Sequence, residues 1–88
     1  MTGGVRGRVV RASDGAPLPE RTVVVVRGAG PAPDIAPLTD ASGRFALDGL
    51  PAGEWVLRAI GPAGETGETT LRVAADRVTE TVIEVDGV

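Results

Sequence analysis

Short runs of alternating apolar and polar residues recur along the chain, and turn-forming residues separate them. Val5 to Val9 alternates small or apolar residues with charged ones, which is typical of a half-buried strand with two arginines facing water. Thr22 to Arg27, TVVVVR, is rich in β-branched residues and is the strongest strand prediction, because branching at Cβ favours extended backbone. The same spacing of two continues in four later groups: Phe45 and Leu47; Trp55, Leu57 and Ala59; Leu71 and Val73; Thr79, Thr81, Ile83 and Val85. No window repeats convincingly with a helical period, so the pattern predicts about seven short strands in an antiparallel sandwich.

The connections between these strands are rich in glycine, proline, aspartate and serine. Ser13 to Pro19 ends the first strand, and Gly28 to Pro37 contains three prolines and two glycines, which predicts a long loop or an irregular edge. Val73 to Glu80, VAADRVTE, is the one segment that could contain a single turn of helix, but we interpret it as a turn between two strands.

The stretch Thr39 to Trp55, TDASGRFALDGLPAGEW, combines two tight turns with large apolar residues. Asp40 stands where its carboxylate can accept a hydrogen bond from the backbone two residues on, and Gly43 where a left-handed residue closes a short hairpin. Leu50 is expected to plug the core before Pro51 begins the second turn, which Gly53 ends, and Trp55 then returns to the core. A calcium site at Asp40, Ser42 and Asp48 is the alternative, but calcium usually takes six to eight oxygen ligands, so it is disfavoured.

The composition restricts both size and chemistry. With 88 residues the chain is expected to form one domain, residues 1–88, with one small core. It has no His, Cys, Tyr, Lys, Asn or Gln, and its nine basic residues are all arginines, with a net charge of -3. Without His or Cys there is no common nucleophile pair and no usual zinc ligand set, so we expect no enzyme activity, no cofactor and no metal.

Two segments, VRGRVVRASDGAPLPERTVVVV and TDASGRFALDGLPAGEWVLRAI, together resemble the carboxypeptidase regulatory-like domain family. Sixteen positions follow its pattern: Gly7, Val9, Gly15, Pro17, Leu18, Val23, Val25, Thr39, Asp40, Gly43, Phe45, Leu47, Leu50, Pro51, Gly53 and Leu57. The resemblance implies an all-β fold, a small seven-stranded antiparallel Greek-key sandwich like that of transthyretin (prealbumin). It also implies a non-catalytic accessory or spacer domain. Glu20 and Arg21 replace the usual Gly-Ala of the family, and Trp55 replaces its common tyrosine.

Enzymes that share this kind of sandwich depend on residues that the chain lacks. The transthyretin-like hydrolases use histidines and a tyrosine-containing C-terminal tail, and the intradiol dioxygenases hold iron with tyrosine and histidine. Pairs of carboxylates remain, such as Asp34 with Asp40 or Glu65 with Glu68, but they lie in segments expected to be solvated loops. We therefore interpret these acidic residues as solubilising.

Binding of a glycan or of nucleic acid is less favoured than binding of protein. Glycans stack on exposed aromatic rings, and both aromatic residues, Phe45 and Trp55, are in the inward phase of their strands, so a carbohydrate-binding module is the alternative function. Arg6, Arg8 and Arg11 with Arg27 or Arg58 would be needed to make a basic stripe. Because the domain carries no overall positive charge, we expect no nucleic-acid partner.

Apolar residues in the outward phase of several strands suggest how the domain interacts. Val23 and Val25 follow the inward phase, which leaves Val24 and Val26 outward. Three further residues are in the outward phase of their own strands: Val10, Val56 and Ile60. If the five lie on one sheet, they form a partner-binding face for a copy of the chain or for a neighbouring domain. The alternative is that β-branched residues occur there only because they favour strands.

We therefore expect a structural or protein-interaction module within a larger assembly or multidomain protein. The sequence has no stretch of about 18 apolar residues and no signal-peptide pattern, so no membrane association is expected. As written, the chain is expected to be soluble and cytoplasmic, unless it is one module cut from a longer secreted protein. Partner and oligomeric state are not predicted.

Overall fold

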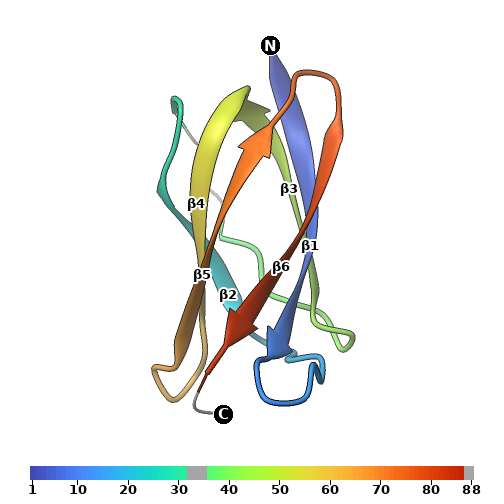
Figure 1. Ribbon diagram of the computed structural model, residues 1–88, viewed down its shortest axis with the longest axis vertical. Coiled ribbons are helices and arrows are strands. Elements are labelled where there is room, and N and C mark those ends of the chain that lie inside the picture. Colours follow the sequence, from blue (N-terminus) through green and yellow to red (C-terminus); the bar gives the residue numbers. More distant parts are fainter. Residues whose placement is uncertain (32–35, 87–88) are drawn as a thin grey trace.

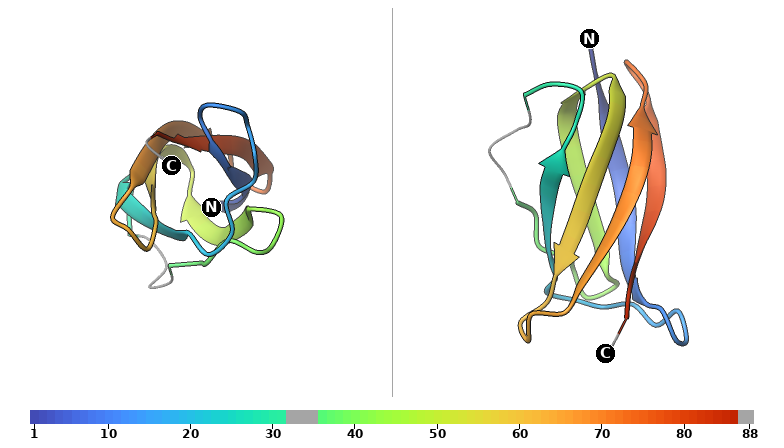
Figure 2. Two further views of the ribbon diagram at one scale, coloured as in Figure 1. Left: turned by 90° about the horizontal axis from the view of Figure 1, so that it is seen from below. Right: turned by 60° about the vertical axis from the view of Figure 1, so that its left-hand side comes forward.

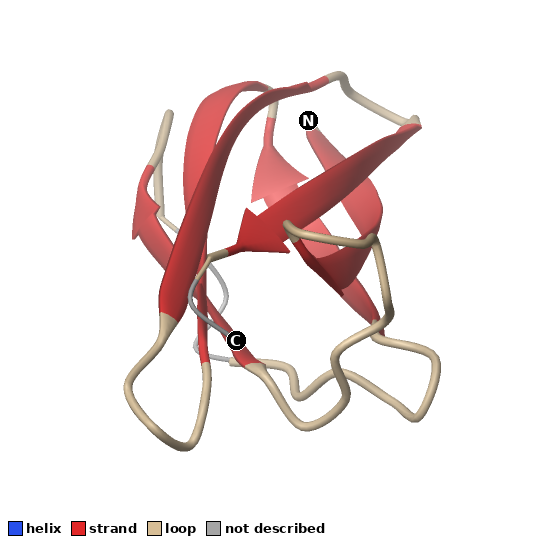
Figure 3. Ribbon diagram, turned by 60° about the horizontal axis from the view of Figure 1, so that its bottom comes forward, coloured by secondary structure: helices blue, strands red, loops and turns tan. Residues whose placement is uncertain are grey.

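Two three-stranded sheets make up the protein, which we describe from a computed structural model for residues 1–31 and 36–86. In the first sheet, β1 (Thr2–Arg11) lies between β3 (Arg44–Pro51) and β6 (Val78–Val85). In the second, β4 (Gly53–Ile60) lies between β2 (Thr22–Arg27) and β5 (Thr66–Val73) (Figure 1). Throughout the described part of the chain the regular elements are strands joined by loops (Figure 3). The prediction of an all-β sandwich is confirmed.

The strand count and one strand direction differ from the prediction. The described ranges contain six strands, not seven, and Leu38 makes only an isolated bridge to Thr22. Pro37 precedes Leu38 and has no amide hydrogen with which to extend that pairing into a ladder. The sheets are also not wholly antiparallel, because β1 and β6 are parallel neighbours. The parallel pair arises because β6, the last strand, follows β5 of the second sheet and runs back beside the first strand.

The core lies between the sheets and consists of the inward residues of every strand. Leu57 and Ile83 are fully buried, and Trp55 is 1% exposed, which confirms the inward phase predicted for these residues. Trp55 also donates a hydrogen bond from Nε1 to the carbonyl oxygen of Pro51 at 2.8 Å. A Cβ on Gly28 would lie 1.8 Å from Cε3 of Trp55, so the chain after β2 is close against the indole ring. Seen along the long axis, the sheets curve around this common interior (Figure 2).

The turn at Asp40 to Gly43 has the predicted chemistry but a different connection. Asp40 Oδ1 accepts hydrogen bonds from the amides of Ser42 at 2.8 Å and Arg44 at 3.0 Å, and Gly43 has φ of 73°. The preceding residues pair with β2 in one sheet and β3 follows in the other, so this turn connects the two sheets and is not the predicted strand hairpin. The buried hydroxyl of Thr39 holds the residue before this turn in place. It donates a hydrogen bond to the Leu18 carbonyl and accepts one from the Arg21 amide, both at 2.8 Å.

The corner before β2, where the chain departs from the family pattern, is held by an ion pair. Glu20 has φ of 57°, a left-handed conformation that favours glycine, the residue usual there in the family. The next residue, Arg21, lies 3.3 Å from Glu65 in the β4–β5 connection, with side chains only 11% and 13% exposed. A Cβ on Gly61 would lie 1.8 Å from Glu65 Oε1. The Arg21 and Glu65 side chains therefore close this corner.

The molecule is elongated, and β1 and β6 run along it. Its principal extents are 36 × 19 × 18 Å. β1 begins at one end of the long axis and β6 ends at the other (Figures 1 and 2). β5 ends at Val73 and β6 begins at Val78, so the expected turn between two strands is present there.

Candidate partner-binding face

Four of the five predicted partner-binding residues lie on one face, the outer surface of the second sheet. Val24 and Val26 are on β2, and Val56 and Ile60 are on the adjoining strand β4. Val24 pairs with Arg58 and Arg27 with Val56, and a bulge between Val25 and Arg27 accommodates Val26. The outward phase was thus a correct guide to position for these four residues.

The pairing of the strands orders this face into rows and adds a residue that the sequence prediction missed. One row across the sheet consists of Leu38, Thr22, Ile60 and Thr66. The next row consists of Val24, Arg58 and Glu68. Residues directly opposite each other in antiparallel pairs point to the same side, so Leu38 joins the outer surface. We call Leu38, Val24, Val26, Val56 and Ile60 the β2–β4 face.

Exposure on the β2–β4 face is greatest along its β2 margin. Leu38 is 59% exposed and Val26 38%, whereas Val24 and Ile60 are half-buried. Val56, on the central strand of the sheet, is only 6% exposed. Next to these residues Arg58 Nε donates a hydrogen bond to Glu68 Oε2 at 2.7 Å. The face is therefore apolar along β2, while on β4 the Arg58–Glu68 ion pair separates Val56 from Ile60.

The fifth predicted residue, Val10, does not belong to this face. It lies on β1 in the other sheet, pairs with Pro17 of the following loop, and is 5% exposed. The hypothesis that all five residues share one sheet is therefore wrong. Alternation gives the side of a strand on which a residue lies, but the sheet to which that strand belongs depends on long-range pairing.

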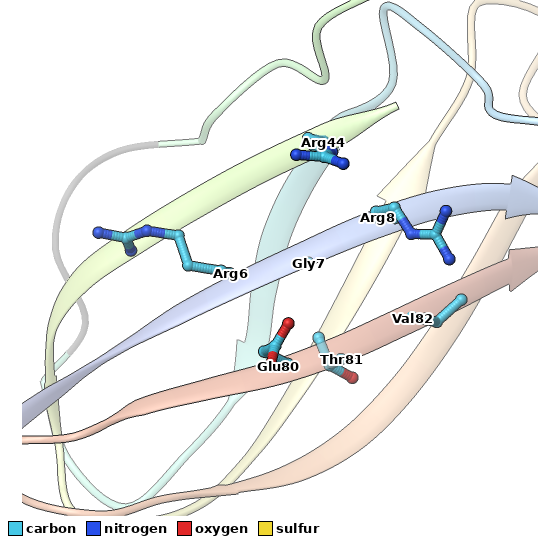
Figure 4. A pocket seen from close by; sticks show the side chains of 7 residues that line it. All are labelled: Arg6, Gly7, Arg8, Arg44, Glu80, Thr81 and Val82. Atoms are coloured by element: carbon cyan, nitrogen blue, oxygen red, sulfur yellow. The ribbon is translucent and has the colours of Figure 1, made fainter. Parts of the chain in front are cut away.

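The outer surface of the first sheet carries more charged side chains, together with the exposed Val78 and Val82 of β6. A depression there is lined by residues of β1, β3 and β6, among them Gly7 and Thr81, which are paired in the register (Figure 4). The side chains along its walls are Arg6, Arg8, Arg44, Glu80 and Val82. The basic stripe considered from the sequence is divided, since Arg27 and Arg58 are in the second sheet and Arg11 pairs with Asp14 at 3.1 Å.

The aromatic residues are placed unfavourably for binding a glycan. Phe45 and Trp55 are 5% and 1% exposed, so neither ring offers a stacking surface. The chain has no other aromatic residue. The carbohydrate-binding alternative therefore gains no support from these two side chains.

The carboxylates considered for catalysis or calcium binding are engaged separately. Glu65 pairs with Arg21 and Glu68 with Arg58, while Asp48 pairs with Arg6 at 3.0 Å. The hydrogen bonds that the Arg44 and Ser42 amides donate to Asp40 hold its pKa below the ordinary value. Asp34 lies outside the described residues. Within residues 1–31 and 36–86, no three acidic side chains gather in a way that would hold a metal ion.

No helix in the described part of the chain is long and apolar enough to span a membrane.

Comparisons with known proteins agree with the architecture. The sequence model of the carboxypeptidase regulatory-like domain matches residues 4–86. Among solved structures, the chain is similar to the major pilin subunit of Bacillus cereus, BcpA, at a TM-score of 0.72 and 10% identity, covering 99% of this chain and 30% of that one. It is also similar to the minor pilin GBS52 of Streptococcus agalactiae, at a TM-score of 0.69 and 22% identity, covering 99% and 45%. A search of curated proteins gave no match. The chain thus spans less than half the length of these two structures.

Proposed function

Because the chain belongs to the carboxypeptidase regulatory-like domain family, we propose that it is a non-catalytic structural module that binds another protein surface through the β2–β4 face. The bound surface belongs either to a second copy of the chain or to a neighbouring domain of a larger protein. The observation that carries this proposal is the apolar margin of the face, where Leu38 and Val26 are 59% and 38% exposed next to half-buried Val24 and Ile60. Apolar side chains exposed on one face of a soluble domain are a feature of protein–protein interaction sites.

Burial of the apolar margin would stabilise a protein contact. Burial of apolar surface stabilises an association by about 25 cal/mol per Å², so a few hundred Å² contribute several kcal/mol before the entropy lost on binding is subtracted. Polar residues lie among the apolar ones as well as beside them, because Thr22 is between Leu38 and Ile60, and Arg58 is bonded to Glu68 of β5.

The comparisons and the composition support a structural role. The two similar solved structures are of pilin subunits, and this fold makes up less than half of each, which supports a part within a larger assembly. The sequence lacks histidine, cysteine and tyrosine, and three of the carboxylates considered for catalysis or calcium binding pair with arginines. These features support a module that acts by binding.

Substitution of two valines at the exposed margin tests the proposal. We expect the wild-type chain to self-associate in sedimentation velocity over tens to hundreds of micromolar, and Val24→Asp with Val26→Asp to remove most of that association. The reason is that two carboxylates would have to be desolvated in the contact. The folded state of the double variant is checked by Trp55 fluorescence, which remains that of a buried indole if the core is intact.

The control uses two exposed valines of the other sheet. Val78 and Val82 on β6 are 58% and 45% exposed, so Val78→Asp with Val82→Asp adds the same charges away from the β2–β4 face. If the wild-type chain stays monomeric, hydrogen exchange is compared between the isolated chain and the same residues in a protein that also contains any neighbouring domains. Added protection in β2 and β4 then supports contact with a neighbouring domain. The proposal is contradicted if neither association nor protection occurs, or if only the β6 variant weakens association.

A further inference from the structure

The strands nearest to the two ends of the chain, β1 and β6, are hydrogen-bonded neighbours that run parallel. Their register pairs eight residues of each strand, from Gly4 with Val78 to Arg11 with Val85. Backbone hydrogen bonds also close both ends of the ladder, from the Gly4 amide to the Arg77 carbonyl at 2.9 Å and from the Ala12 amide to the Val85 carbonyl at 3.0 Å. The ladder therefore extends over almost the whole of β1.

The direction of the ladder decides how it responds to tension along the chain. β1 begins at one end of the 36 Å axis and β6 ends at the other, so tension between residues 2 and 86 pulls the two strands past each other along their length (Figure 1). In this shear geometry all the hydrogen bonds of the ladder are loaded together. When two strands are instead pulled apart at the same end, the bonds are loaded and broken one after another.

We propose that the β1–β6 ladder is a mechanical clamp that allows the domain to carry tension between the proteins or domains on either side of it. This inference rests on the proposed function, because it gives the structural module a specific mechanical task. The clamp is the first part of the fold to be loaded, since residues 2–11 and 78–85 receive the force before any other strand does.

The inner side of the clamp is sealed by the core. Val5 and Val9 of β1 and Ile83 of β6 are fully buried, and Val85 is 1% exposed. Water reaches this side of the ladder poorly, so a strained hydrogen bond there has no ready replacement partner. Sliding β6 along β1 would also break the packing of these side chains before the strands separate.

The outer side of the clamp places opposite charges on the two strands. Arg6 of β1 is aligned with Glu80 of β6 in the register (Figure 4), but the Arg6 guanidinium pairs with Asp48 of β3 at 3.0 Å. This ion pair links β1 to β3, so the β1–β6 clamp depends on its backbone ladder and on its buried inner side. The charged depression of the first sheet lies over the same two strands.

The second sheet supports β6 from its other side. The Thr79 hydroxyl donates a hydrogen bond to the Arg72 carbonyl of β5 at 3.0 Å. A Cβ on Gly67 of β5 would lie 2.1 Å from the Glu84 carbonyl oxygen, so the two backbones are too close for any side chain at that position. With β5 on one side and β1 on the other, β6 cannot leave the fold without disturbing both sheets.

Single-molecule force spectroscopy tests the clamp with two directions of pulling on the same fold. The sequence has no cysteine, so introduced cysteines define the attachment points in the 88-residue chain. Thr2→Cys with Asp86→Cys loads β1 and β6 in shear. Ser13→Cys with Asp86→Cys loads them from one end, because Ser13 follows the end of β1 next to the end of β6. All three positions are exposed, and thermal unfolding checks that the two variants are equally stable.

We expect the unfolding force at a common pulling speed to be several-fold higher for the pair at positions 2 and 86 than for the pair at 13 and 86. The clamp is overturned if the two forces are equal, or if the first pair unfolds at the lower force. The measurement uses isolated molecules and needs no partner. Equal unfolding forces would therefore contradict the clamp and leave the proposed binding face unaffected. If the chain shows no association but unfolds at a much higher force in the pair at positions 2 and 86, the clamp is supported and the binding face is not.

Discussion

The two sheets are alike on their inner faces and different on their outer ones. Inside, both supply buried aliphatic residues at every second position, such as Val9 on β1 and Leu57 on β4. Outside, the first sheet carries arginines and glutamates around Arg8 and Glu80, whereas the second has the β2–β4 face with Val24 and Val26. The shared inner pattern specifies the sandwich, and the outer surfaces, which the fold does not constrain, distinguish what each sheet does.

The difference extends to how the strands are joined. In the first sheet β1 and β6 are parallel and belong to opposite ends of the sequence, while the strands of the second sheet are all antiparallel. Under our two proposals, the first sheet transmits tension along the chain and the second binds a partner laterally. The two proposed roles use different faces of one small domain.

Removal of the Trp55 side chain should have the largest effect, since it belongs to the interior that both sheets share. We expect Trp55→Ala to destabilise the protein by about 3–5 kcal/mol, comparable with the whole stability of a small domain, and to leave it largely unfolded. Circular dichroism with chemical denaturation measures this. Trp55→Phe, which keeps a ring but loses the hydrogen bond to Pro51, serves as the milder control. A stable alanine variant would contradict the assignment of Trp55 to the core.

The turn that connects the two sheets gives the next largest effect. Gly43 and Gly49 have nearly the same positive φ, 73° and 77°, but a Cβ on Gly43 would lie 2.7 Å from the Val9 carbonyl oxygen, while nothing lies within 4 Å at Gly49. An L-residue in the left-handed region costs roughly 1–2 kcal/mol, so Gly49→Ala should lose about that amount and Gly43→Ala clearly more. Equal denaturation midpoints for the two variants would show that contact with β1 does not constrain this turn.

The smallest effect concerns the charge of Asp40 in the same turn. Amide hydrogen bonds from Arg44 and Ser42 lower its pKa in the folded state, so its stabilising contribution is present above the unfolded-state pKa and is lost as the pH falls through the folded-state value. Asp40→Asn keeps an acceptor oxygen and should therefore be less sensitive to acid than the wild type. Thermal unfolding between neutral and strongly acidic pH measures this. Asp40→Ala, which has no acceptor, should be less stable at every pH. An unchanged pH profile in the Asn variant would contradict the turn assignment.

Local chemistry in the sequence predicted the parts of the fold that depend on neighbouring residues. The inward phase of Trp55, the hydrogen-bonded carboxylate of Asp40 and the left-handed Gly43 each follow from residue types within a few positions, and the structure confirms all three. Glu20 is instructive in the same way, because its positive φ is the conformation for which the family pattern has glycine.

The parts that sequence reasoning missed depend on pairing between distant segments. Val10 and Val24 share the outward phase, but the strands that carry them join different sheets. Leu38 follows the proline-rich loop and belongs to the β2–β4 face only through its bridge to Thr22, which no local periodicity indicates. The parallel pairing of β1 with β6 also could not be read from local sequence. It joins eight positions of each strand that are more than sixty residues apart in the sequence.

The central claim, that the β2–β4 face is the surface that binds protein, is tested most directly by residue-resolved NMR. Amide shifts of the isolated chain are followed from dilute to concentrated solution and are compared with those of the same residues in a protein that also contains any neighbouring domains. The proposal predicts that at least one of these comparisons shifts amides around Leu38, Val24, Val26 and Ile60, while those around Arg8 and Glu80 stay in place. Shifts confined to the charged face of the first sheet, or no shifts in either comparison, would contradict it.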